Sequence, residues 1–148
     1  MSRRDAFPPF AGSAPGLAIL TALLASGCQQ IGPAVYGVTE PPLSCAAARG
    51  YDEAGTASWY GRAHHGRRTA SGQRFDMHGL TAAHRRLPLG SKVRVTNRNN
   101  GKSVLLTITD RGPFVPGRVV DVSYGAAKEL NFVGAGLAPV RVTAVETC

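Results

Sequence analysis

The pattern of apolar and polar residues changes near residue 55. Downstream of that point, short stretches alternate between the two kinds of residue, whereas the preceding stretch shows few periodic apolar positions. In residues 92–97, Val93 and Val95 fall on one face of an extended chain and polar residues fall on the other, as in a half-buried strand. The pattern therefore predicts β structure for this part of the chain.

A hairpin follows this strand. Asn99-Asn-Gly101 supplies turn residues that join residues 92–97 to a returning strand at residues 103–110. In the returning strand the even-numbered apolar positions share one face, and Asp110 ends that row. We therefore expect Asp110 to lie at the edge of an apolar face.

The remaining elements are also short. Leu80–His84 is a further ordered segment, and three more strands are predicted at Thr56–Tyr60, Val119–Ser123 and Pro139–Glu146. The hydroxyl of Ser123 is placed to cap a short helix over Tyr124–Asn131. Several short strands with one hairpin and one small helix predict a mainly β, compact barrel.

The N-terminal residues have the features of an export signal. Arg3 and Arg4 precede the apolar run Leu17–Ala25, which is too short to span a bilayer but suits the core of a signal peptide. The run ends in Ala25-Ser-Gly-Cys28, and small residues before a cysteine are what lipoprotein processing requires. We predict a lipoprotein signal peptide at residues 1–27 with lipidation of Cys28. An ordinary secretory signal cut nearby is the alternative, and both export the domain.

The residues after Cys28 predict a tether and a location. Residues 28–51 hold two proline-containing turns and few periodic apolar positions, which indicates a lipidated N-terminus and flexible tether before a domain at residues 52–148. Gln29 follows the acylated cysteine, where aspartate commonly retains a lipoprotein in the inner membrane. The expected location is therefore the inner leaflet of the outer membrane, facing the periplasm.

Two cysteines remain if Cys28 is acylated. Cys45 and Cys148 flank the predicted domain, and an exported protein is exposed to an oxidising compartment. A disulfide between them would tie the last residue to the entry of the fold. Two separate thiols are the alternative, because the sequence does not supply their distance.

The charge narrows the choice of partners. The chain carries 17 Lys and Arg against 9 Asp and Glu, a net charge of +8. A basic surface suits nucleic acid, anionic lipid or an anionic polymer. Export removes most nucleic-acid partners, and the basic residues lack the aromatic interleaving of a strand-binding surface. An anionic cell-wall polymer fits best.

Asp110 carries the most informative chemistry. A carboxyl at the edge of an apolar face is partly desolvated, which raises its pKa and suits a general acid. The turn-forming residues Arg111–Phe114 follow it, so a carboxylate that caps this turn through backbone N–H groups is an equal reading. Strand alternation points Arg111 away from Asp110.

Six blocks of sequence in order resemble the rare lipoprotein A (RlpA) family. They run through the whole domain: Ala57-Ser-Trp-Tyr-Gly61, His65-Gly-Arg-Arg-Thr-Ala-Ser-Gly72, Arg74-Phe-Asp-Met77, Leu80-Thr-Ala-Ala-His84, Leu87-Pro-Leu-Gly90 and Asp110-Arg-Gly-Pro-Phe114. The resemblance implies a six-stranded double-psi β-barrel with one or two short helices, related to the barrels of expansins.

The resemblance also implies an activity. It is that of a peptidoglycan lytic transglycosylase, which cleaves the MurNAc–GlcNAc bond of glycan strands and leaves 1,6-anhydro-MurNAc ends. Asp110 would be the catalytic acid and base, with His84 in the same groove; a half-buried packing role is the alternative for His84. The residues expected to bind substrate are Tyr60, Thr69, Gln73 and Arg111. The rival function is a non-catalytic, expansin-like protein that binds wall glycan.

Two departures from the family pattern bear on function. Gln73 stands where the family usually has a glutamate in Thr69-Ala-Ser-Gly-Gln73, and an amide neither ionises nor readily gives up a proton. Many members carry a C-terminal SPOR domain, and this chain ends at Cys148, so targeting by that route is not expected. No cofactor is expected, and the spacing of His64, His65, His78 and His84 does not favour a metal site.

Overall fold

The computed structural model describes residues 40–148. The predicted signal peptide at residues 1–27, the predicted lipidation site Cys28 and the first part of the predicted tether lie outside the described residues. Across residues 40–148, the helices are too short or too polar to cross a membrane.

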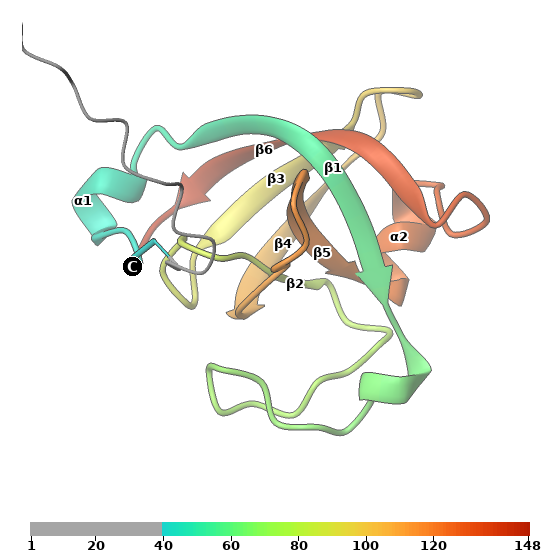
Figure 1. Cartoon of the computed structure of the whole chain (residues 1–148), viewed down its shortest axis with the longest axis horizontal. Coiled ribbons are helices and arrows are strands. Elements are labelled where there is room, and N and C mark those ends of the chain that lie inside the picture. Colours follow the sequence, from blue (N-terminus) through green and yellow to red (C-terminus); the bar gives the residue numbers. More distant parts are fainter. Residues whose placement is uncertain (1–39) are drawn as a thin grey trace, which may run out of the picture. The chain divides into compact units, whose positions relative to one another are not determined.

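Six strands close into a barrel in the order β1-β5-β2-β4-β3-β6 (Figure 1). Their bounds are β1 Asp52–Tyr60, β2 Thr81–Ala83, β3 Lys92–Asn97, β4 Ser103–Asp110, β5 Arg118–Ser123 and β6 Leu137–Glu146. β1 pairs parallel with β5 and β2 pairs parallel with β4, whereas the other four pairings are antiparallel. The predicted mainly β, six-stranded barrel is confirmed.

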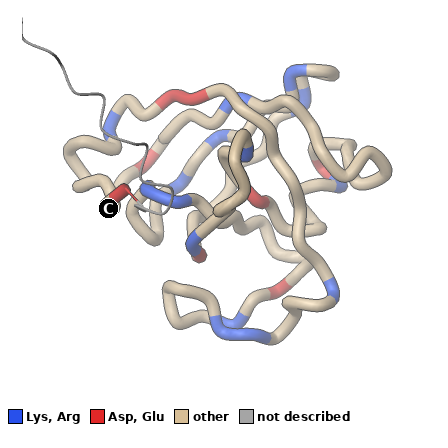
Figure 2. Tube along the Cα trace, in the orientation of Figure 1, with Lys and Arg blue, Asp and Glu red and all other residues tan. Residues whose placement is uncertain are grey.

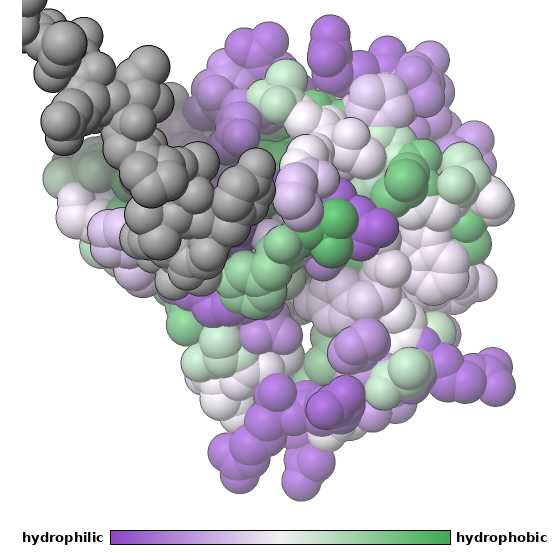
Figure 3. All heavy atoms as spheres, viewed as in Figure 1, coloured by the Kyte–Doolittle hydropathy of each residue, from purple (hydrophilic) through white to green (hydrophobic). Residues whose placement is uncertain are grey.

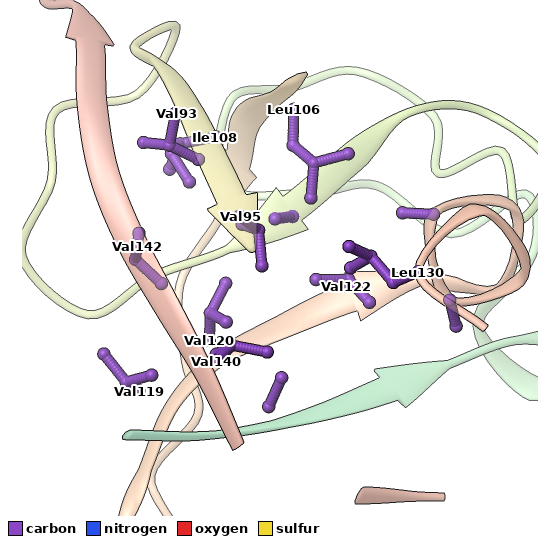
Figure 4. Close-up of a cluster of buried hydrophobic side chains, with 14 of the residues drawn as sticks. Val93, Val95, Leu106, Ile108, Val119, Val120, Val122, Leu130, Val140 and Val142 are labelled. Carbon is purple, nitrogen blue, oxygen red and sulfur yellow. The ribbon is translucent and has the colours of Figure 1, made fainter. Parts of the chain in front are cut away.

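Branched apolar side chains fill the interior of the barrel (Figure 4). The predicted alternation in β3 is confirmed, because Val93 and Val95 are fully buried while Arg94 is exposed. Val95 lies opposite Val104 on β4 and Val142 on β6, so one strand contributes to contacts with both neighbours. Each fully buried side chain of this size contributes about 1.5–3 kcal/mol, which makes the interior the main source of stability.

The predicted hairpin and the predicted helix are both present. Gly101 closes the hairpin turn with a φ of 72°, a left-handed conformation that glycine adopts without steric cost. Helix α2 (Tyr124–Glu129) follows β5, and the Ser123 hydroxyl accepts a hydrogen bond from the Ala126 N–H at 3.2 Å. The helix ends two residues earlier than predicted, and Asn131 just beyond it has a positive φ of 56°.

Residues 40–51 pack against the barrel instead of forming part of a tether. They include helix α1 (Cys45–Ala48), and the side chain of Ala48 is fully buried in the core. Upstream of α1, the Leu43 N–H donates to the Arg86 carbonyl at 2.8 Å. The predicted flexible tether is therefore wrong over residues 40–51. Helix α1 is a single turn, which is too short to show a helical period of apolar residues in the sequence. The residues that hold this segment in place are distant in sequence.

Strand β1 begins four residues before the predicted start. Residues 52–55 pair with β6, with Asp52 opposite Thr143 and Gly55 opposite Val140. Gly55 also lies against β5, where an added Cβ would come within 2.9 Å of Val119. The glycine therefore marks a close approach between strands, although in the sequence it looks like the boundary of a strand.

A disulfide joins the two ends of the described chain. Cys45 in α1 and Cys148 at the C-terminus are bonded, with Cα atoms 5.7 Å apart and a sequence separation of 103. The Thr147 hydroxyl also donates to the Cys45 carbonyl at 3.1 Å. The last residues are thereby fastened to the segment that enters β1.

We predict that replacing Cys45 and Cys148 by serine lowers the free energy of unfolding by about 2–4 kcal/mol, because a long loop is no longer closed in the unfolded chain. Chemical denaturation of the oxidised protein and the double variant measures the difference. Alkylation of the unreduced native protein is the companion experiment: labelling of both thiols would contradict the bond.

Candidate active site

A cavity of about 550 Å³ lies outside the barrel, between its wall and the loop that joins β1 to β2. Its floor comes from β1, β5, β2 and the end of β4, and its rim comes from residues 64–75 of the loop. In Figure 1 this loop projects from the barrel after β1, and it includes a single 3₁₀ turn at Arg62–His64. The space-filling view shows hydrophilic side chains at the far end of this projection (Figure 3).

Four floor residues lie in register on four adjacent strands. Ser58 on β1 pairs with Asp121 on β5, Asp121 pairs with Ala83 on β2, and Ala83 pairs with Asp110 on β4. Residues in register on neighbouring strands point to the same side of a sheet. Two carboxyl groups therefore face one cavity, with the small side chain of Ala83 between them.

Asp110 reaches this floor because β4 carries an irregularity just before it. Ala82 pairs with Ile108, but Ala83 pairs with Asp110, so β4 has one extra residue at Thr109. Such a bulge reverses the alternation of the side chains that follow it. Asp110 consequently leaves the apolar row that Ile108 belongs to, and the prediction that Asp110 closes that row on the same face is wrong.

The carboxylate of Asp110 also holds the loop in place. Its Oδ1 atom accepts hydrogen bonds from the backbone N–H groups of Ala70 and Arg111, both at 2.9 Å. The turn-capping contacts considered as one reading of Asp110 are therefore present. They fix one oxygen, while Oδ2 accepts no hydrogen bond from residues 40–148 and remains available for a ligand.

Tyr60 forms the aromatic part of the site. Its ring stacks on Phe75 with centroids 4.3 Å apart, and its hydroxyl is buried with no hydrogen bond of normal geometry among residues 40–148. Burial raises the pKa of Tyr60, and the negative charges of Asp110 and Asp121 raise it further, against a small opposing effect of the Thr81 hydroxyl. Tyr60 therefore stays a neutral phenol, and the residue lines the cavity.

The other residues predicted to bind substrate are divided by the structure. Thr69 and Arg111 line the cavity. The Thr69 hydroxyl is already engaged, because it donates to the Gln73 carbonyl at 3.1 Å. The Arg111 guanidinium donates to the carbonyls of His84 and Leu87, and its partial burial lowers its pKa while Asp110 opposes that shift. Gln73 is exposed on the loop and lies outside the lining of the cavity.

His84 is buried beside the site rather than in it. Its Nδ1 atom accepts hydrogen bonds from the N–H groups of Arg86 and Leu87, and its Nε2 atom lies 2.8 Å from the Tyr51 hydroxyl, which in turn donates to Glu53. The ring does not line the cavity. The structure therefore places His84 outside the cavity lining, with both ring nitrogens engaged in hydrogen bonds, and its predicted part in catalysis stays a prediction.

Positive charge surrounds the two carboxylates. Arg67 and Arg68 come from the loop and Arg118 from the start of β5, and all three line the cavity. Figure 2 shows Lys and Arg segments along the projecting loop. The guanidinium groups suit a ligand that carries negative charge at its periphery, while the carboxylates suit positive charge that develops at its centre.

Sequence reasoning missed three residues of the floor: Ser58, Arg118 and Asp121. One signal was available for Asp121, since it is a carboxylate flanked by valines inside a predicted strand. Such a residue is seldom buried without a partner. Its partner, Ser58, is 63 positions away and becomes visible only when β1 and β5 are paired. Among residues 40–148 there is no cluster of three or more His, Cys, Asp or Glu side chains arranged to hold a metal ion.

The closed six-stranded barrel is a double-psi β-barrel, and comparison with known sequences gives the family. The profile of the family described as lytic transglycolase matches residues 52–142, and the chain belongs to that family.

Curated relatives of the chain carry the name endolytic peptidoglycan transglycosylase RlpA. The protein of Pseudomonas aeruginosa is 50% identical over 112 residues, which cover 76% of this chain and 32% of that protein. The protein of Neisseria meningitidis is 52% identical over 92 residues, which cover 62% of this chain and 38% of that protein. The chain thus spans about a third of the length of the curated relatives it matches.

Solved structures show the same fold at much lower identity. The Streptomyces papain inhibitor matches with a TM-score of 0.52 and 18% identity, covering 66% of this chain and 97% of that one. The expansin of Clavibacter michiganensis matches with a TM-score of 0.51 and 19% identity, covering 65% of this chain and 51% of that one. At these identities the likeness concerns the fold alone.

The environment of His84 predicts how stability depends on pH. Burial lowers the pKa of His84 from 6.5 to about 4, and the charges of Arg85, Arg111 and Arg86 act in the same direction. Between pH 6.5 and about pH 4, His84 is protonated in the unfolded chain and neutral in the folded one. The free energy of unfolding therefore decreases as the pH falls. We expect the free energy of unfolding to drop by on the order of 3 kcal/mol from pH 6.5 to pH 4 through this group.

Denaturation curves of the native protein and His84→Gln across this range isolate that contribution, because other groups cancel in the difference. His78→Gln, which changes an exposed histidine, is the matched control and should keep the native pH dependence. Parallel curves for the native protein and His84→Gln would contradict the assignment.

Proposed function

We propose that this domain is a peptidoglycan lytic transglycosylase that cleaves the MurNAc–GlcNAc bond of glycan strands and leaves 1,6-anhydro-MurNAc ends. The observation that carries the proposal is the Asp110 carboxyl group, which faces a cavity of about 550 Å³ with one oxygen fixed and the other available. The names of relatives about 50% identical to the chain support the same reaction.

The reaction suits one carboxyl group that gives and then takes a proton. In its acid form, Asp110 protonates the glycosidic oxygen as the bond from that oxygen to C1 of MurNAc breaks. The C6 hydroxyl of the same sugar forms the new bond to C1, and its proton passes to the Asp110 carboxylate. The acid form is restored, no water is consumed, and the substrate supplies its own nucleophile. Ordinary glycosidases need a second carboxylate for that role.

Other lining residues hold the glycan in place. The Tyr60 ring, stacked on Phe75, forms part of the cavity surface against which a sugar ring packs. The guanidinium groups of Arg67, Arg68 and Arg118 bind carboxylates carried by peptidoglycan. Arg111 acts differently, because its hydrogen bonds to the His84 and Leu87 carbonyls fix the turn that follows Asp110.

Gln73 does not need to ionise in this mechanism. It is exposed, it lies outside the lining of the cavity, and only its backbone carbonyl contributes to the loop by accepting from Thr69. The replacement of the family glutamate by glutamine is therefore compatible with proton transfer by Asp110. The alternative of a non-catalytic, expansin-like binder is not favoured, because the curated relatives carry the names of enzymes.

Asp110→Asn should reduce the release of anhydro-muropeptides by about 10²–10⁴-fold, because the amide keeps the shape of the side chain but transfers no proton. The assay incubates the protein, purified in detergent, with sacculi stripped of stem peptides and measures products by mass spectrometry. Asp76→Asn on the outer loop is the matched control and should retain native activity. Native product yield from Asp110→Asn would refute the assignment.

We further propose that the protein is a lipoprotein acylated at Cys28 and located at the inner leaflet of the outer membrane, facing the periplasm. The small residues before Cys28 and the presence of Gln29 after it support this location. Acyl chains on one cysteine supply enough apolar surface for stable anchoring when more than one is attached.

Membrane fractionation tests this proposal. The native protein should sediment with outer membranes, and Cys28→Ser should appear in the soluble periplasmic fraction because it has no thiol to acylate. The double variant Cys45→Ser, Cys148→Ser is the control, since it removes both cysteines outside the processing site and keeps Cys28. Recovery of the native protein entirely in the soluble fraction would show that residues 25–28 are an ordinary cleavage region.

A further inference from the structure

The floor of the cavity contains a second carboxylate that the mechanism above leaves unused. Asp121 lies on β5 in register with Ala83, and Asp110 lies in register with the same alanine from the other side. Adjacent strands are about 4.8 Å apart, so the backbones at the two aspartates are separated by roughly 10 Å. The intervening side chain is a single methyl group, which leaves space above it for part of a sugar ring.

Both carboxyl groups line the same cavity and lie near the same phenol. Each lines the cavity, and the negative charge of each raises the pKa of the buried Tyr60 hydroxyl. Tyr60 lies two residues after Ser58 on β1 and therefore on the same face of that strand. Two carboxylates and one phenol thus converge on a shared space instead of facing separate surfaces.

Asp121 is held in a defined orientation. The Ser58 hydroxyl, which is 7% exposed, donates to Oδ1 of Asp121, and the Arg118 guanidinium donates to the Ser58 hydroxyl oxygen at 3.3 Å. The second oxygen, Oδ2, accepts no hydrogen bond from residues 40–148. This is the same arrangement as at Asp110: protein donors fix one oxygen of the carboxylate and leave the other for a ligand.

We propose that Asp121 is a second catalytic carboxylate of this site, which stays ionised and stabilises the positive charge that develops on the sugar as the glycosidic bond breaks. The inference rests on the proposed transglycosylase function. Asp121 exchanges no proton: Asp110 protonates the leaving oxygen and receives the proton of the C6 hydroxyl. A fixed negative charge near C1 and the ring oxygen lowers the barrier because it favours the transition state over the neutral substrate.

The proposal also explains how the site works with a glutamine at position 73. A glycoside-cleaving site with an oxocarbenium-like transition state benefits from a carboxylate beside the acid. Gln73 carries no charge and is exposed outside the cavity. Asp121 supplies the charge from the barrel wall, where β-sheet pairing on both sides of β5 fixes its position.

The experiment compares the native protein with Asp121→Asn, Asp121→Glu and the control Glu129→Gln, which removes an exposed carboxylate from α2. Each protein is incubated with sacculi stripped of stem peptides, and release of anhydro-muropeptides is measured against substrate concentration. We expect Asp121→Asn to lower kcat by about 10²–10³-fold with KM changed by less than about threefold. We expect Asp121→Glu to recover part of the loss and Glu129→Gln to match the native protein.

The split between kcat and KM separates a catalytic charge from a structural one. Removal of a charge that acts in the transition state lowers kcat and leaves KM and the melting temperature near their native values. Native kcat in Asp121→Asn would overturn the proposal. So would a parallel loss of melting temperature, glycan binding and activity, which is the mark of a structural residue. Absence of anhydro products from the native protein would instead overturn the proposed function, and this inference with it.

Discussion

Strand β2 has only three residues, and its backbone is paired to β4 on one side and to β5 on the other. The cavity depends on this double pairing, because Ala83 is the residue at which the registers of the two neighbours meet. Both aspartates are placed by backbone hydrogen bonds rather than by contacts between their side chains. A shift of one residue on either side of β2 would turn one carboxyl group to the opposite face of the sheet.

The bulge at Thr109 is the second part of this arrangement. Regular alternation would direct Asp110 toward the same side as Ile108, which is fully buried in the barrel. A carboxylate in that position would lie in an apolar interior without donors, which is costly. The extra residue instead brings Asp110 to the outer wall, where backbone N–H groups hold it. One extra residue in β4 therefore leaves Ile108 in the interior of the barrel and places Asp110 in the candidate active site.

Local features of the sequence predicted the parts of the fold that depend on neighbouring residues. The alternation of Val93 and Val95, the glycine turn at Gly101 and the Ser123 cap each involve residues a few positions apart, and all three are present. The site was predicted less completely, because its geometry depends on pairing between distant strands. Asp110 was found from the end of its strand and from the family resemblance. Asp121 was missed because its partner Ser58 lies far away in sequence.

The bond between Cys45 and Cys148 also has a mechanical consequence. A pull on the chain from the N-terminal side of α1 reaches the domain at Cys45. Without the disulfide, all of this tension would pass into the first strand and peel β1 from β6 one hydrogen bond at a time. With it, the tension divides between the first and last strands, which are antiparallel neighbours over seven residue pairs. The disulfide therefore divides a pulling force between β1 and β6, which are paired along their length.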